Sequence, residues 1–171
     1  MPDLREKDIQ SFIMMWKRGR GLIVPNIYLK YGEADILFVT NAGIATEFEI
    51  KTSLRDFKND KKKTVKHGMY EHAFEKKAVK PEELIPNYFV YVFPSDVEIP
   101  KEDMPKYSGA FKVTDKAGLG YYNFFSFKKS VHIHKTKCNW DKLIARSCAF
   151  RMAEIHLKNF YKTKEVGMCN A

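Results

Sequence analysis

Residues 33–51 read EADILFVTNAGIATEFEIK, and this stretch decides the fold of the chain. Two segments rich in apolar residues, 33–40 and 44–51, flank the tripeptide NAG at positions 41–43. Asparagine and glycine favour tight turns, and three-residue hairpin loops commonly place glycine in the left-handed conformation. The sequence therefore predicts two antiparallel strands joined by a three-residue loop, with Gly43 in the left-handed position.

The loop length also sets which residues of the two strands face each other. In the predicted register, Asp35 lies opposite Glu49. Two positions further from the loop, Glu33 lies opposite Lys51. Because side chains alternate across a strand, all four project from one face, with opposed Cβ atoms about 4.5–5.5 Å apart. Two carboxylates at that spacing can share a divalent cation through oxygens about 2.0–2.6 Å from the metal, so the pattern indicates a metal site.

The opposite face of the hairpin is apolar and suits a protein core. It carries Ile36, Phe38, Phe48 and Ile50. The alternative to a metal site is a charged face exposed to solvent, where acid–lysine pairs across strands are common. Two features argue against this alternative. Both strands are apolar enough to lie inside a sheet, and an exposed face would more often place a lysine than a second acid opposite Asp35.

Composition and charge narrow the classes of function. The chain has 171 residues, of which 44% are hydrophobic, which excludes a disordered protein and predicts a single domain over residues 1–171. No apolar stretch approaches the ~20 residues of a membrane helix, and the N-terminus lacks the apolar block of a signal peptide. With only three cysteines, we expect a cytoplasmic protein without a membrane partner. A net charge of +9 favours an anionic partner, most often nucleic acid.

The other elements are predicted from hydrophobic periodicity and turn residues. They are, in chain order, a helix over 4–17, a strand over 22–29, a charged and mostly helical region over 54–77, a buried strand over 88–93, strands over 120–127 and 130–134, and a helix over 140–162. Prolines at 94, 100 and 105 mark an irregular excursion between the buried strand and the later ones. This order predicts an α/β sandwich with a mixed central sheet.

At the hairpin the sequence resembles the PD-(D/E)xK nucleases. Members of this superfamily carry an aspartate on one strand and Glu-x-Lys on the next, matched here by Asp35, Glu49 and Lys51. Ala34 departs from the proline in the family name. The resemblance implies a restriction-endonuclease-like fold, in which helices flank a central mixed sheet.

The continuation EIKTSLRDFKNDKKK resembles the MmcB-related and phage-encoded branch of this superfamily. In that branch a serine and an Asp-Phe pair follow the lysine, matched by Ser53, Asp56 and Phe57, with Asp60 and Lys62 next. The resemblance gives Ser53 and Asp56 auxiliary roles in the site. It also implies an enzyme of DNA repair, recombination or phage DNA metabolism.

The implied activity is metal-dependent hydrolysis of DNA phosphodiester bonds. Asp35, Glu49 and the backbone carbonyl of Ile50 would hold the cation, and ligation by oxygen alone favours Mg²⁺ or Mn²⁺ over zinc. Lys51 would orient or deprotonate the attacking water, or stabilise the pentavalent phosphate. The alternative is a nucleic-acid-binding protein on the same fold that has lost cleavage.

Two further glutamates are candidates for the site. Glu6 shares a helical stripe with Ile9 and Ile13, and in the resembled family a first-helix glutamate points at the metal. The alternative for Glu6 is a capping box with Asp3. Glu33 is either an auxiliary ligand or a partner for Lys51, and we favour the partner role.

A run of lysines follows the hairpin at the point where a DNA backbone would have to lie. Its members are Lys58, Lys61, Lys62, Lys63 and Lys66. A solvated helix face is the alternative for such a run. Contacts to several phosphates would make DNA binding strongly salt-dependent. If the enzyme is a junction resolvase, we expect a homodimer, because resolvases of this fold act as symmetric dimers.

Overall fold

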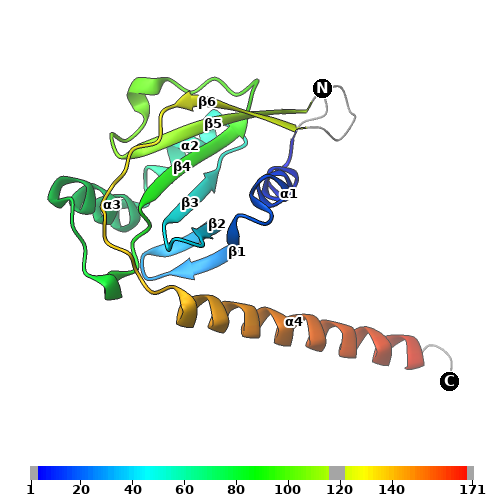
Figure 1. Cartoon of the computed structure of the whole chain (residues 1–171). Helices are drawn as coiled ribbons and strands as arrows, with labels where there is room; N and C mark the ends of the chain where they lie inside the picture. The colour runs from blue at the N-terminus through cyan, green and yellow to red at the C-terminus, as the bar shows by residue number, and fades with distance from the viewer. Residues whose placement is uncertain (1–3, 116–121, 169–171) are drawn as a thin grey trace. The chain divides into compact units, whose positions relative to one another are not determined.

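A computed structural model describes residues 4–115 and 122–168 of the chain (Figure 1). The chain divides into two compact units, one ending at Asn139 and the other beginning at Trp140. The first unit carries the β-sheet, and the second carries a long helix. The single domain predicted over residues 1–171 stays a prediction.

A six-stranded sheet forms the centre of the first unit, with neighbouring strands in chain order. The strands are β1 (Gly21–Leu29), β2 (Gly32–Thr40), β3 (Ala45–Ile50), β4 (Tyr88–Pro94), β5 (Ser108–Asp115) and β6 (Tyr122–Lys128). Strands β1 to β3 are antiparallel, β3, β4 and β5 are parallel, and β6 returns antiparallel to β5. The sheet is therefore mixed, as the sequence predicts.

Helices flank this sheet on both faces (Figure 1). They are α1 (Glu6–Lys17), α2 (Leu54–Asp60) and α3 (Thr64–Lys76), with short 3₁₀ turns at Pro81–Glu83 and Lys101–Asp103. The α1 side chains Ile9, Phe12 and Ile13 pack into an apolar core with alternate residues of β2, β3 and β4. Residues of α2 and α3 contact side chains on the other face of the sheet. An example is the edge-to-face pair of Phe57 with Tyr91.

The β2–β3 hairpin has the predicted loop and register. Ile36 lies opposite Phe48, and the pairing continues without a shift to the loop. Within the loop the Gly43 N–H donates to the Thr40 carbonyl at 2.8 Å, and Gly43 has φ of +79°. Glycine adopts this left-handed conformation at little cost, which explains why the loop sequence specifies the pairing so well.

Two sequence expectations at the far side of the sheet are wrong. Strand β5 lies within the segment predicted to be irregular, and residues 130–134 form no strand. Both differences arise from contacts between segments that are distant in the sequence. A Cβ on Gly109 would lie 2.6 Å from the Cα of Ser130, so the chain after β6 passes directly over β5. Pairing with β4 and β6 thus stabilises a segment whose nearby prolines indicated a loop.

The second unit is the helix α4 (Asp141–Met168). It begins one residue after the predicted helix and ends six residues beyond it. The helix exposes apolar side chains, and those of Met152 and Ile155 are 71% and 60% exposed. Neither α4 nor any other helix among the described residues is apolar over enough of its length to span a membrane.

Candidate functional site

Asp35 lies on β2 and Glu49 lies on β3, and their side chains project from the same face of the sheet. The Asp35 carboxylate accepts a hydrogen bond from the Ile50 backbone N–H at 2.6 Å. Asp35 is half-buried and Glu49 is fully buried. Burial, and second the charge of Glu49, raise the pKa of Asp35 to about 7. A cation between the two carboxylates would relieve this repulsion.

Three lysines surround the Glu49 carboxylate. One oxygen, Oε1, lies 2.8 Å from Lys51 Nζ and 2.7 Å from Lys63 Nζ. The other oxygen, Oε2, lies 2.5 Å from Lys66 Nζ. The alternative of a solvated charged face is therefore wrong for Glu49 and Lys51, which are 0% and 5% exposed.

Asp60 is the last residue of α2, and its carboxylate links Lys51 to residues at the start of α3. Its carboxylate lies 3.2 Å from Lys51 Nζ and 2.9 Å from Lys63 Nζ. It also accepts from the Tyr91 hydroxyl at 2.9 Å and contacts His67 Nε2 at 3.1 Å. Burial acts to raise the pKa of Asp60, but the His67 contact and the lysines hold that pKa below its usual value. Asp60 thus positions the Lys51 ammonium beside Glu49.

Glu47 is a buried carboxylate that sequence reasoning missed. It lies 2.5 Å from Lys66 Nζ, and the Tyr70 hydroxyl donates to it at 2.5 Å. Burial raises its pKa, while the charge of Lys66 opposes this effect. Strand alternation places Glu47 on the same face as Glu49, so its position was available from the sequence. Its partner Lys66 was not, because α3 supplies it from outside the hairpin.

The residues after β3 form the start of α2. The Ser53 hydroxyl accepts from the Asp56 N–H at 3.1 Å, and the Asp56 carboxylate accepts from the Thr52 N–H at 3.3 Å. The Ser53 hydroxyl is thus the N-cap of α2, and it satisfies an N–H group that the first helical turn leaves unbonded. Asp56 also lies 4.0 Å from Lys51 Nζ. The auxiliary residues Ser53 and Asp56 therefore fix where the chain turns after Lys51.

The structure corrects the expected surroundings of Glu6. The side chain of Glu6, the first residue of α1, is exposed, whereas Ile9 and Ile13 are fully buried. The carboxylate that caps α1 belongs to Asp8, which accepts from the Arg5 backbone N–H at 3.1 Å. The alternative partner in a capping box, Asp3, lies outside the described residues.

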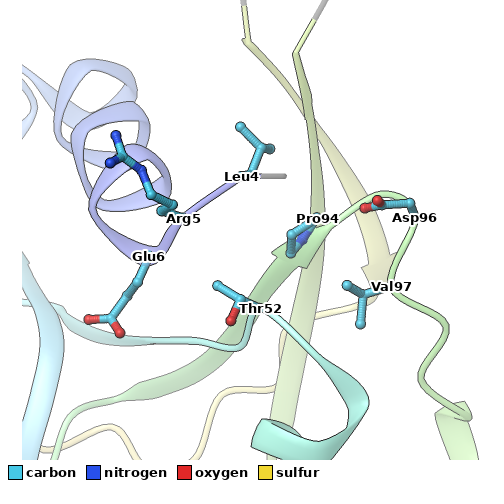
Figure 2. Close-up of a pocket in the computed structure, with 7 residues that line it drawn as sticks. All are labelled: Leu4, Arg5, Glu6, Thr52, Pro94, Asp96 and Val97. Atoms are coloured by element: carbon cyan, nitrogen blue, oxygen red, sulfur yellow. The ribbon is translucent and has the colours of Figure 1, made fainter. Parts of the chain in front are cut away.

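Glu6 instead lines a pocket of about 410 Å³ beside the end of β3. Figure 2 shows Glu6 and Asp96 on opposite sides of this pocket, with Thr52 and Pro94 between them. Thr52 directly follows Lys51, so the pocket adjoins the charged cluster. The charge of Glu6 also contributes to the raised pKa of Asp35, after burial and Glu49.

The lysine run divides into exposed and buried members. Lys58, Lys61 and Lys62 are exposed, with Lys61 3.2 Å from Asp103 and Lys62 3.0 Å from Asn59. Lys63 is half-exposed. The structure corrects the prediction that Lys66 contacts DNA, because α3 directs it into the interior, where 1% of the residue is exposed.

Glu33 does not pair with Lys51, which corrects the role we favoured for it. Among the described residues, the carboxylates within 4.0 Å of Lys51 Nζ belong to Glu49, Asp56 and Asp60. Glu33 is exposed, and its backbone carbonyl accepts from Lys66 Nζ at 3.0 Å. The role of an auxiliary ligand for Glu33 stays a prediction.

The oxygen donors at the end of β3 suit a hard divalent cation. Within residues 4–115 and 122–168, no group of three or more His, Cys, Asp or Glu side chains is arranged to hold a metal. Asp35 and Glu49 are two carboxylates, and Mg²⁺ commonly binds through one or two carboxylates and its remaining waters. The cation site predicted at Asp35, Glu49 and the Ile50 carbonyl stays a prediction.

Comparisons with known proteins bear on the fold alone. No family model and no curated protein matches the sequence. A solved structure, the SPO1766 protein of unknown function from Silicibacter pomeroyi, is similar with a TM-score of 0.55 and 15% identity. The match covers 93% of this chain and 92% of that chain. The likeness agrees with an α/β fold over nearly the whole length.

Proposed function

We propose that the chain is a Mg²⁺- or Mn²⁺-dependent deoxyribonuclease of the PD-(D/E)xK superfamily, with a restriction-endonuclease-like fold. The observation that carries the proposal is the hydrogen bond from Ile50 to Asp35, which aligns Asp35 with the Glu49-x-Lys51 segment. The motif lies on a hairpin that follows α1 and precedes α2, the context in which the resemblance is most specific.

In the proposed reaction the chain's own residues position a cation, a water and a phosphate. Asp35, Glu49 and the Ile50 carbonyl would hold the cation, which when bound would supply activation of water and offset charge on the phosphate. Burial lowers the pKa of Lys51, but Glu49 and Asp60 raise it more, so the side chain stays an ammonium. A charged Lys51 orients the water and stabilises the phosphate rather than acting as a base.

The DNA backbone would approach across the exposed lysines of α2 and the turn that follows it. Lys58, Lys61 and Lys62 are exposed there, and the net charge of +9 favours a polyanion. Glu6 lies at the rim of the adjoining pocket and adds negative charge near Asp35. With the resemblance, these features support a cytoplasmic enzyme of DNA repair, recombination or phage DNA metabolism, and a homodimer if it resolves junctions.

One observation favours a second candidate, a nucleic-acid-binding protein on the same fold without cleavage. The Glu49 carboxylate is engaged by the ammonium groups of Lys51, Lys63 and Lys66. These contacts take three of the roughly four acceptor positions of the carboxylate, so a cation has to compete with the ammonium groups. DNA binding without cutting in any metal would support this second candidate.

The test is cleavage of labelled linear, nicked, branched and single-stranded DNA with Mg²⁺, Mn²⁺ or EDTA. The proposal expects cutting that needs the metal and is lost in Asp35→Asn. Asp96→Asn is the matched control, because Asp96 lines the pocket and lies outside the charged cluster. Metal-independent cutting, or full activity of Asp35→Asn, would contradict the proposal.

A further inference from the structure

We propose that Lys63 is an exchangeable counter-ion of the site. Its ammonium neutralises Glu49 and Asp60 in the free protein, and it moves to a DNA phosphate when a divalent cation binds at Glu49. This inference rests on the proposed function. It gives Lys63 a positioning role that depends on whether the cation is bound.

The first argument is the difference in exposure among the lysines around Glu49. The side chains of Lys51 and Lys66 are 6% and 1% exposed, whereas that of Lys63 is 48% exposed. A buried ammonium that loses its carboxylate stays in a poorly solvated interior, which is strongly unfavourable. A half-exposed ammonium can turn into water instead. Lys63 is therefore the lysine that a cation displaces.

The second argument is the charge around the Lys63 ammonium. The carboxylates within 4.0 Å of the Lys63 ammonium are those of Glu49 and Asp60, and both side chains are fully buried. A divalent cation at Glu49 would place two further positive charges beside this ammonium. Repulsion between like charges at that distance favours departure of Lys63 from the site.

The third argument is the position of Lys63 in the chain. It directly precedes α3 and follows the exposed pair Lys61 and Lys62. The lysine side chain is a flexible four-carbon stem with a compact charge, so it can reach from Glu49 towards a phosphate held by these neighbours. The same residue therefore neutralises the cluster before binding and contacts the backbone after it.

Calorimetric titration of Mn²⁺ into DNA-free protein tests the exchange. We expect Lys63→Ala to bind Mn²⁺ about threefold or more tightly than wild type, because a competing cation is removed. Lys62→Ala, which lacks a contact to Glu49, should bind Mn²⁺ like wild type. Lys63→Gln keeps a polar side chain without charge and should resemble Lys63→Ala. Thermal unfolding of each variant checks that it is folded.

A second measurement follows the lysine onto DNA. Fluorescence anisotropy of a labelled duplex is compared in EDTA and in Ca²⁺, with the DNA checked on a gel to be intact. Lys63→Ala should weaken DNA binding more in Ca²⁺ than in EDTA, whereas Lys62→Ala should weaken it equally in both. Equal losses for Lys63→Ala would overturn its transfer to the phosphate.

The outcomes of the titration separate this inference from the proposed function. Equal Mn²⁺ affinity in wild type and Lys63→Ala would overturn the exchange and leave the proposed nuclease intact. No Mn²⁺ binding by any of the proteins would contradict both. Weaker binding by Lys63→Ala would show that Lys63 supports the cation rather than competing with it, and would also overturn the exchange.

Discussion

The Asp35 carboxylate accepts a 2.6 Å hydrogen bond from the backbone N–H of Ile50, the residue between Glu49 and Lys51. This bond joins β2 to β3 just beyond the pair of Ile36 with Phe48. It holds one oxygen of Asp35 against the strand that carries Glu49. The bond therefore fixes the geometry of the two carboxylates on which the proposed chemistry depends.

The raised pKa of Asp35 predicts a pH-dependent stability. With its pKa raised from 3.8 to about 7, the folded protein binds this proton more tightly than the unfolded chain does. The contribution of the Asp35 carboxyl group to the free energy of unfolding is complete below the pKa of the unfolded chain. It is lost as the pH rises through the folded pKa of about 7. As the pH rises from 5 to 8 in EDTA, the free energy of unfolding of wild type should fall by about 2 kcal/mol more than that of Asp35→Asn. This figure is discounted because Asp35 is partly exposed.

Urea denaturation of both proteins across this pH range measures the difference. The amide introduced by Asp35→Asn does not titrate, so subtracting the pH profile of this variant isolates the carboxyl group of Asp35. Parallel profiles would contradict the raised pKa and the closeness of Asp35 to Glu49.

The buried position of Lys66 predicts a large loss of stability on its removal. Lys66→Met would leave Glu47 and Glu49 without the ammonium that lies 2.5 Å from each. Removing one partner of a buried ion pair costs about 3–5 kcal/mol. The control Lys58→Met, at an exposed position, should stay within about 0.5 kcal/mol of wild type. Similar unfolding free energies for the two variants would contradict a structural role for Lys66.

The N-cap of α2 predicts a smaller loss of stability. Ser53→Ala removes the hydroxyl that accepts from the Asp56 N–H, and loss of such a cap costs about 1 kcal/mol. Ser11→Ala is a matched control, because that hydroxyl donates to the Lys7 carbonyl within α1 and alanine favours helix. Thermal unfolding should show a lower midpoint for the first variant alone. A midpoint of Ser53→Ala equal to that of wild type would refute the cap.

Two glycines predict opposite effects of the same substitution. Gly43→Ala places a Cβ at φ of +79°, which costs about 1 kcal/mol or more. Gly68 lies within α3 with open space at its Cβ position, so Gly68→Ala should stabilise the helix by up to about 1 kcal/mol. Chemical denaturation measures both. Stabilisation by Gly43→Ala would contradict the hairpin conformation.

The hairpin was predictable because its determinants are local. The loop sequence sets the pairing, and the alternation of side chains then assigns each residue of β2 and β3 to a face. Both predictions rest on neighbouring residues, and the pair of Ile36 with Phe48 confirms them. Strand β5 was missed because its stability comes from pairing with two other strands, which the local sequence around its prolines does not encode.

The partners of the site were not predictable in the same way. Lys66 and Asp60 face Glu49 and Lys51 because α2 and α3 pack on one face of the sheet, and their lysine-rich sequence is equally typical of a solvated helix. The burial of Lys66 is decided by helix orientation. That orientation follows from tertiary packing, which composition and spacing do not specify.

The most direct test of the central claim combines metal binding and cleavage in three proteins. Mn²⁺ is titrated into wild type, Asp35→Asn and Lys51→Ala, and each sample is then given labelled DNA. We expect wild type to bind and cut, Lys51→Ala to bind Mn²⁺ without cutting, and Asp35→Asn to do neither. Mn²⁺-dependent cutting by Asp35→Asn at the rate of wild type would contradict a cation held by Asp35 and Glu49.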